Sequence, residues 1–352
     1  MKRKTKKIFF PCFIIWIASY FISRVLWIAL FLLGLLTGVS EMIFSMLNKL
    51  LKHTNWYKNN FINTNQFVSN AGYRTNRIRN YDIVNVGSNP ALFSLSYENI
   101  KGLNWSTGTQ GLDMDYQILR YFHSYIRKGG IVLLPITPFS SISPWADDKG
   151  IKKGNAQYIA KFASILDGYQ VKGLPNYKSA VRFIQYPLMH HFRAVKYIIK
   201  DCKKDDRLDI DEQPLKYDDL ILDAKRWMKG WKAEFDLNDL NDVFDARYKP
   251  YYDRAVAQVR QTINFCIDRE LQPVLMFPPM TDYLSREFPQ KIKMKLMYDF
   301  IKDVNKSNIP FLDYTDNPEF KDPNLYLNSF FLNLHGRKLF THRVLKDLHL
   351  ID

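Results

Sequence analysis

Residues 81–90 read Tyr-Asp-Ile-Val-Asn-Val-Gly-Ser-Asn-Pro, and this stretch decides the fold class of the 352-residue chain. Its first six residues, 81–86, are rich in β-branched side chains and predict a short buried strand. The four residues that follow combine glycine and proline with small polar side chains, which predicts a sharp turn and then the start of a helix. A strand, a turn and a helix in this order form the repeating unit of an α/β protein.

Further units of the same kind follow along residues 79–352. Strands that alternate with helices predict a mostly parallel sheet with helices on both faces. Between about 140 and 248 the pattern changes to a mostly helical period, which predicts an inserted helical cap. The predicted strands are 102–105, 131–134, 273–277 and 309–314. The predicted helices are 91–97, 113–127, 254–270, 290–306 and 332–348.

The N-terminal region, residues 1–52, predicts a membrane anchor. Five lysines and arginines lie within residues 2–7, and an apolar run from Ile8 to Val39 follows in which Arg24 is the only charge. The run is longer than a bilayer requires and longer than the core of a cleaved signal peptide. The basic start is typical of a cytoplasmic end, so we expect one span with the body outside the cytoplasm. A two-pass hairpin, with the body in the cytoplasm, is the alternative.

Residues 41–52 have the apolar spacing of a helix that lies at the membrane interface, and 53–78 are polar and predict a linker. The formal net charge is +15, of which residues 1–52 contribute +7. No nucleic-acid motif accompanies this charge, so we expect attraction to anionic lipid or an anionic surface polymer instead. Met189-His190-His191 lacks metal-ligand spacing, and the three cysteines suggest no disulfide framework, although Cys202 and Cys266 could pair.

Polar and turn-forming residues follow several predicted strands. In a parallel sheet the carboxyl ends of the strands share one edge, and the chemistry lies beyond that edge. Residues 87–89, 107–111, 135–137 and the Pro278-Pro279 pair are therefore predicted to lie on one rim. No glycine-rich phosphate loop is present in the sequence.

The strand followed by Gly87-Ser88-Asn89 resembles the first block of the SGNH (GDSL-like) hydrolase superfamily. The nearest variant occurs in membrane-anchored acyl-transfer proteins of the teichoic-acid D-alanylation and alginate-acetylation types. The resemblance implies a flavodoxin-like three-layer α/β/α fold, with Ser88 at the nucleophile position. It also implies that the backbone N–H groups of Ser88 and Gly111 form an oxyanion hole, which acyl transfer to a serine requires.

The last block of that superfamily reads Asp-x-x-His-Leu-Asn-x-x-Gly and precedes a terminal helix. Leu332, Asn333 and Gly336 match its end, but Asn328 occupies the aspartate position and Phe331 occupies the histidine position. The asparagine of the third block is also missing, and the residue nearest to that place is Thr137.

Phenylalanine cannot accept the proton of a serine hydroxyl, so the usual triad is incomplete. Three alternatives stay open. His335, four residues beyond Phe331, could act as the base; His190 or His191 of the insertion could complete the site; or the chemistry has been lost.

Several of these residues also have a purely structural interpretation. Ser88 could simply cap a helix, and Asp113 and Asp115 fit the first turn of the helix that follows Gly111. Asn333 and Gly336 are expected to start and pack the last helix. Asp313 fits a turn. Most of five aromatic residues are expected to pack in the core rather than to stack on sugars; these are Trp145, Trp227, Trp231, Tyr251 and Tyr252.

The sequence and the resemblance together predict an envelope protein of cell-surface polysaccharide modification, with impaired or lost catalysis on O-acyl groups. The alternatives are a non-catalytic glycan-binding or scaffold subunit of an assembly or export complex, and an anchored serine esterase with a rebuilt triad. The expected partners are the membrane, a surface glycan and, by resemblance, a membrane-bound O-acyltransferase. No nucleic acid, metal or cofactor is expected.

Overall fold

The computed structural model describes residues 24–54, 79–106, 108, 110–142, 188, 192–200 and 217–352. The chain divides into two compact units. One comprises residues 1–57 and 185–203, and the other comprises 58–184 and 204–352. Each unit is described by itself below.

The second unit is an α/β domain built on a five-stranded sheet in the order β2-β1-β3-β4-β5. Every neighbouring pair is parallel. The strand order reverses direction between β1 and β3, which makes the carboxyl ends of these two strands the topological switch point of the sheet. The strands are β1 (Tyr81–Asn85), β2 (Gly102–Asn104), β3 (Ile126–Pro135), β4 (Gln272–Phe277) and β5 (Phe311–Asp313).

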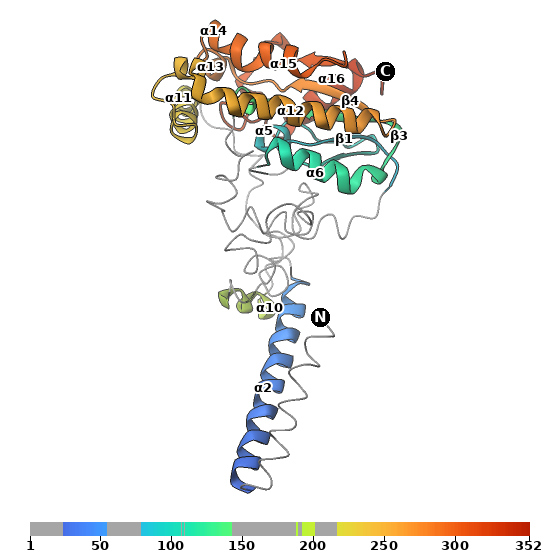
Figure 1. Cartoon of the computed structure of the whole chain (residues 1–352), viewed down its shortest axis with the longest axis vertical. Helices are drawn as coiled ribbons and strands as arrows, with labels where there is room; N and C mark the ends of the chain where they lie inside the picture. The colour runs from blue at the N-terminus through green and yellow to red at the C-terminus, as the bar shows by residue number, and fades with distance from the viewer. Residues whose placement is uncertain are drawn as a thin grey trace. The chain divides into compact units, whose positions relative to one another are not determined.

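Successive residues of the central strands face two separate cores. In β3, Val132 and Leu134 belong to the larger core, whereas Ile131 and Leu133 belong to the smaller one. The larger core contains the apolar residues of α6 and α12, which lie side by side (Figure 1). The smaller core is closed by α16. Because strand side chains alternate between faces, this division shows helices on both faces of the sheet, as the sequence predicted.

The helices agree with the predicted order of elements. They are α5 (Asn89–Leu92), α6 (Leu112–Phe122), α11 (Tyr217–Glu234), α12 (Lys249–Ile267), α13 (Asp282–Ser285), α14 (Gln290–Lys293), α15 (Asp299–Val304) and α16 (Leu334–Asp347). A π-helical turn (Met294–Tyr298) joins α14 to α15, so the predicted helix over 290–306 forms as one interrupted helix.

The predicted helix over 113–127 is too long. In the structure α6 ends at Phe122, and β3 begins at Ile126, five residues before the predicted strand. The pairing of β1 with β3 shifts register between Tyr81 and Ile83. Between these two paired positions, β3 contains more residues than β1 does. Gly129, with φ = 71°, is one of the additional residues. A glycine in the left-handed region is typical of such a bulge.

The predicted insertion over about 140–248 is helical where the structure describes it. Its described part in the second unit consists of a 3-10 turn (Ser140–Ile142), α11 and two further 3-10 turns (Leu240–Phe244 and Ala246–Tyr248). A 3-10 turn (Phe192–Val195) and α10 (Lys196–Ile199) also fall in the predicted range, but they belong to the first unit. Ala224, Met228 and Trp231 of α11 belong to the larger core. This part of the predicted insertion therefore packs into the α/β domain, whereas residues 185–203 belong to the first unit.

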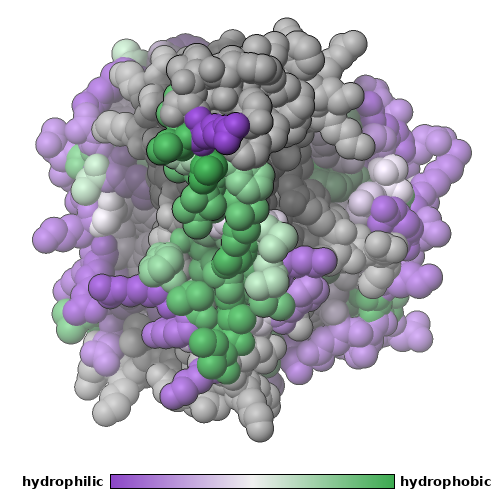
Figure 2. Space-filling model, turned by 90° about the horizontal axis from the view of Figure 1, so that it is seen from below, coloured by the Kyte–Doolittle hydropathy of each residue, from purple (hydrophilic) through white to green (hydrophobic). Residues whose placement is uncertain are grey.

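The first unit contains α2 (Arg24–Leu51), a 28-residue helix that is long and apolar enough to cross a membrane. Its apolar side chains are largely exposed and form the hydrophobic column seen in Figure 2. Residues 41–51 continue α2 instead of forming the separate interfacial helix that their spacing predicted. A short helix, α10 (Lys196–Ile199), contacts α2 within this unit, and Asn48 of α2 accepts the N–H of Leu188.

Candidate functional site

The turn after β1 is shaped by Gly87. Its φ of 118° lies in a region that other residues rarely adopt, and a Cβ atom there would lie 2.8 Å from the Cβ of Ala91. Ser88 follows as the first residue before α5, but its side chain makes no capping hydrogen bond. Ser88 therefore occupies the N-cap position of α5, as its structural interpretation expected, but its hydroxyl does not supply a capping hydrogen bond.

A buried polar network lies beneath this turn. The Asn85 side-chain amide donates to Asn104 Oδ1 at 2.8 Å and to Ser106 Oγ at 2.7 Å. Asn104 in turn donates to the backbone carbonyls of Ala91, Leu92 and Leu95 around α5. Buried amides linked in this way hold the backbone in one arrangement, so the end of β1, the end of β2 and α5 form a rigid base for Ser88.

A cavity of about 360 Å³ opens at the carboxyl ends of β1 and β3. This is the switch point at which ligands bind in doubly wound sheets, and the volume lies in the range of small-molecule sites. The lining residues come from the loops after β1, β2 and β3, from α6 and α11, and from the segment before α16. They are residues 87–90, 110–112, 115, 135, 137–140, 227, 231, 234, 235, 330 and 331.

Asp115 connects the first two of these loops. Its Oδ1 atom accepts the backbone N–H of Gly87 at 2.9 Å and the side-chain amide of Gln110 at 2.6 Å. Burial raises the pKa of Asp115 to about 7, although both hydrogen bonds act in the opposite direction. The expectation that Asp115 only serves the start of a helix is therefore too narrow, since its carboxyl group also positions the Gly87–Ser88 turn.

Aromatic rings form a wall of the cavity. Phe331 stacks on Phe93 with ring centroids 4.9 Å apart, and it meets Trp227 edge-on at 5.2 Å. Phe330 lies 5.1 Å from Trp231. Phe331, the residue that the resemblance sets at the histidine position, is 8% exposed, so a buried ring stands there.

The aromatic wall is held by hydrogen bonds between distant parts of the chain. Asp223 of α11 accepts both the backbone N–H and the hydroxyl of Ser329, at 3.0 and 2.6 Å. The Ser329 carbonyl accepts the hydroxyl of Thr281 at 2.7 Å. Asn328 accepts the backbone N–H groups of Phe330 and Phe331, so its side chain stabilises a turn.

The structure brings some of the predicted rim residues together at the cavity. Ser88, Gly111, Thr137 and Phe331 all line the cavity. The Thr137 hydroxyl is 2.9 Å from the hydroxyl of Ser140, and Gly111 forms the N-cap of α6.

The Pro278-Pro279 pair and Asp313 do not line the cavity; Asp313 accepts the hydroxyl of Tyr298. The side chain of His335 is exposed and is also outside the lining. His190 and His191, like Cys12, Cys202 and Trp145, lie outside the described residues.

The expected structural roles of Asn333 and Gly336 are confirmed. Asn333 caps α16 by accepting the N–H of Gly336 at 2.9 Å. Tyr251 and Tyr252 pack against the larger core, as expected. Trp227 and Trp231, which were expected to be core residues, both pack there and line the cavity. Sequence reasoning did not select Gln110, Asp115 or Phe330 as site residues.

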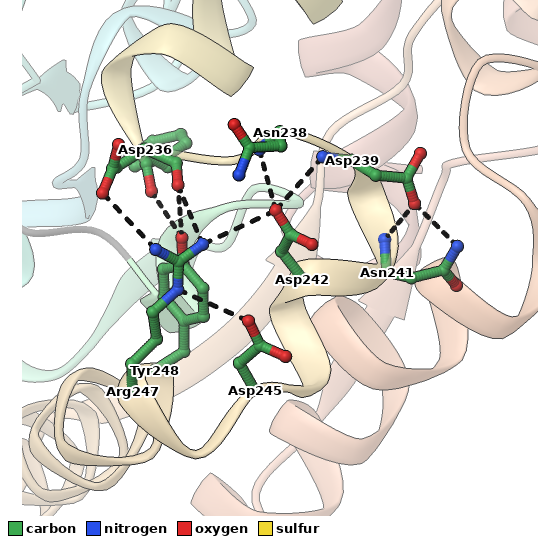
Figure 3. A network of polar contacts seen from close by, with 9 residues as sticks. Asp236, Asn238, Asp239, Asn241, Asp242, Asp245, Arg247 and Tyr248 are labelled. Carbon is green, nitrogen blue, oxygen red and sulfur yellow. Dashed lines mark hydrogen bonds and ion pairs between the residues drawn. The ribbon is translucent and has the colours of Figure 1, made fainter.

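A polar network connects α11 to α12 behind the aromatic wall. The chain turns at Asp236, whose φ is 56°, and the guanidinium of Arg247 lies among the carboxylates of Asp236, Asp242 and Asp245 at 3.5 Å each (Figure 3). These ion pairs are largely exposed and individually weak. The hydroxyl of Tyr248 contacts the carbonyls of Phe235 and Asp236, at 2.8 and 2.9 Å, from a buried ring.

Replacing Tyr248 with phenylalanine is expected to lower the free energy of unfolding by about 1–2 kcal/mol, because the carbonyl of Phe235 loses its buried donor, whereas that of Asp236 keeps Arg247. Urea unfolding of the full chain measures this change. Tyr251→Phe is the matched control, since the structure gives the Tyr251 hydroxyl no hydrogen bond among the described residues. Equal stability of the two variants would show that the Tyr248 hydroxyl does not hold the α11–α12 connection.

The chain matches no protein-family model and no curated protein. No histidine, lysine or arginine is among the described residues that line the cavity. A serine hydroxyl without a neighbouring base is a weak nucleophile at neutral pH.

Proposed function

We propose that this protein is a membrane-anchored, SGNH-like component of cell-surface polysaccharide modification, and that its cavity binds a glycan without Ser-His-Asp chemistry. One observation carries the proposal. The Ser88 turn opens on a cavity at the switch point of the sheet, and Phe331 occupies the wall where the superfamily places its base. Binding can persist at such a site when proton transfer is impossible, because the cavity and its polar groups remain.

The strand order supports the fold assignment. The order β2-β1-β3-β4-β5 is that of flavodoxin-like sheets, which the SGNH resemblance implies. Ser88 lies in the short turn between β1 and α5, at the place where the resemblance puts the nucleophile.

The apolar helix α2 supports membrane anchoring by its length and composition. The lysines and arginines that precede α2 in the sequence favour a cytoplasmic N-terminus, with the α/β domain on the outer side. A membrane-bound O-acyltransferase partner belongs to the proposal on the resemblance alone.

Labelling with a fluorophosphonate probe tests the absence of serine chemistry. The full chain in detergent is expected to react no more than its Ser88→Ala variant, because an unassisted hydroxyl is a poor nucleophile. An active serine esterase in the same tube confirms that the probe works. Labelling that disappears in Ser88→Ala would overturn this part of the proposal, and His190→Ala and His191→Ala would then identify the base.

A further inference from the structure

A second segment of the chain packs against the C-terminal end of α2 in the first unit. The side chain of Asn48 in α2 is buried and accepts the backbone N–H of Leu188 at 3.0 Å. Leu188 belongs to the same small buried cluster as Leu51, in the last turn of α2. Residues 192–199 form a 3-10 turn and α10, and both contact α2 (Figure 1). These contacts hold residues 192–200 beside the last turns of α2.

The end of α2 has the position and the charge of a membrane surface. A helix of 28 residues is about 42 Å long, whereas the hydrocarbon core of a bilayer is about 30 Å thick. If α2 crosses the core, about one turn at each end therefore lies among the lipid headgroups. Arg24 begins α2 and Lys49 lies in its last turn, and both charges are favoured at that depth. A segment that packs on the last turns of α2 lies at the same level.

The exposed side chains of residues 192–200 are all apolar or basic. Phe192 is 75% exposed, and Ile199 is 86% exposed. The other exposed side chains of the segment are cationic, and they are Arg193, Lys196 and Lys200. Glu41 is the only acidic residue among those that the structure describes in the first unit. The segment therefore presents apolar groups and positive charge together, without neutralising carboxylates close to it in the sequence.

Such a surface fits a bilayer with anionic headgroups. Single exposed apolar residues are common on soluble proteins, but here two lie on one short segment that packs on an exposed apolar helix. Segments that lie in the membrane interface combine phenylalanine and aliphatic residues with lysine and arginine in this way. An anionic bilayer offers hydrocarbon and negative charge at one surface, so it matches both kinds of side chain.

We infer that residues 192–200 dock on the anionic phospholipids that surround the C-terminal end of α2. Phe192 and Ile199 insert between the lipids, and the three cationic side chains contact phosphate groups. The inference rests on the membrane anchoring in the proposed function and adds a second lipid contact, which is distant from α2 in the sequence. Docking of this segment is expected to depend on the charge of the lipids, because its cations contribute to it.

Lipid contact is tested with an NBD fluorophore on Ile199→Cys, in the full chain reconstituted in nanodiscs of phosphatidylcholine and phosphatidylglycerol. Cys12→Ala and Cys202→Ala remove the other reactive thiols, and Cys266 is buried. The label is expected to be quenched by a nitroxide-bearing phospholipid and shielded from acrylamide in the water. The same label on Asp268→Cys, an exposed position of the α/β domain, gives the reference for a solvent-exposed side chain.

Two triple variants test the role of charge. The first replaces Arg193, Lys196 and Lys200 with glutamine. Each cation near an anionic surface favours binding about fivefold, so this variant is expected to lower the ratio of lipid-docked to free segment by at least ~10-fold. The matched control replaces Lys225, Arg226 and Lys229, which are exposed on α11, with glutamine. It removes the same charge and is expected to leave the quenching at position 199 unchanged.

Lipid quenching at position 199 no stronger than at position 268 would overturn the inference, and shielding from acrylamide without lipid quenching would indicate a protein partner instead. Equal quenching in the two triple variants would overturn the role of the anionic headgroups. A label on Leu36→Cys, a position of α2 that is 67% exposed, reports on insertion itself. If that label escapes lipid quenching, the proposed anchoring fails together with this inference; if only the label at position 199 escapes, the anchoring stands.

Discussion

Replacement of Asp115 with asparagine is expected to stabilise the protein by about 2–4 kcal/mol at pH 8 and by much less at pH 4. Burial raises the pKa of this carboxyl group from its usual 3.8 to about 7. Between those two values the folded protein holds a proton that the unfolded chain has released, so the stability of the wild type falls as the pH rises from about 4 to about 7. Asparagine does not ionise, and its oxygen can still accept from Gly87 and Gln110.

Urea unfolding of both proteins at pH 4, 6 and 8 measures this effect as a difference that grows with pH. Asp268→Asn, at an exposed aspartate just beyond α12, is the matched control and is expected to change stability by less than about 0.5 kcal/mol at each pH. If the difference between wild type and Asp115→Asn does not increase between pH 4 and 8, the carboxyl group is not protonated by its burial.

Replacement of Gly336 with alanine is expected to destabilise the protein by about 3 kcal/mol or more, and to lower its Tm by roughly 6–12 °C. A Cβ atom at this position would lie 2.1 Å from the carbonyl oxygen of Leu325. That carbonyl cannot easily move, because it accepts the N–H of Asn333 at 3.0 Å and Leu325 is buried. The clash is therefore expected to displace the start of α16.

Gly230→Ala is the control for this second substitution. Gly230 lies on the exposed face of α11, and a Cβ atom there meets nothing within 4 Å. Alanine favours a helix by about 0.5–1 kcal/mol over glycine, so this variant is expected to gain stability. Thermal unfolding of both variants followed by circular dichroism separates the two cases. Loss of less than 1 kcal/mol in Gly336→Ala would mean that the 325–336 segment adapts to the added atom.

The two substitutions probe different parts of the frame around the candidate site. Asp115 supports the Gly87–Ser88 turn on the polar side, and Gly336 allows α16 to begin directly after the segment that carries Phe330 and Phe331. Each experiment therefore tests whether the cavity is built by a rigid frame, independently of what binds in it.

The order of strands and helices could be predicted from the sequence because it depends on local patterns. Each predicted strand from 81–86 to 309–314 is present, with bounds that differ by a few residues except at β3. The start of β3 was missed because Arg127, Lys128 and Gly129 do not form an apolar run. Their strand conformation depends on pairing with β1 and on an ion pair between Arg127 and Asp82, which the local sequence does not reveal.

The rim prediction succeeded for Ser88, Gly111 and Thr137 for a topological reason. Parallel strands end at one edge, so residues that follow adjacent strands meet there whatever their separation in sequence. The same rule does not say which of the rim residues line the cavity. It also included Pro278 and Pro279, which follow β4 and do not line the cavity.

The sequence by itself determined that this protein has an apolar N-terminal helix and an α/β domain with Ser88 at a strand end, since composition and periodicity specify such local features. Only the tertiary structure decided what surrounds Ser88. Asp115 reads in sequence as a helix-start residue, Trp227 reads as a core residue, and Phe331 was noted only as the residue at the expected histidine position. They became a polar support and an aromatic wall because the folded chain brings α6, α11 and the segment before α16 to the same edge of the sheet. Contacts between residues more than 100 positions apart depend on packing, which no local pattern encodes.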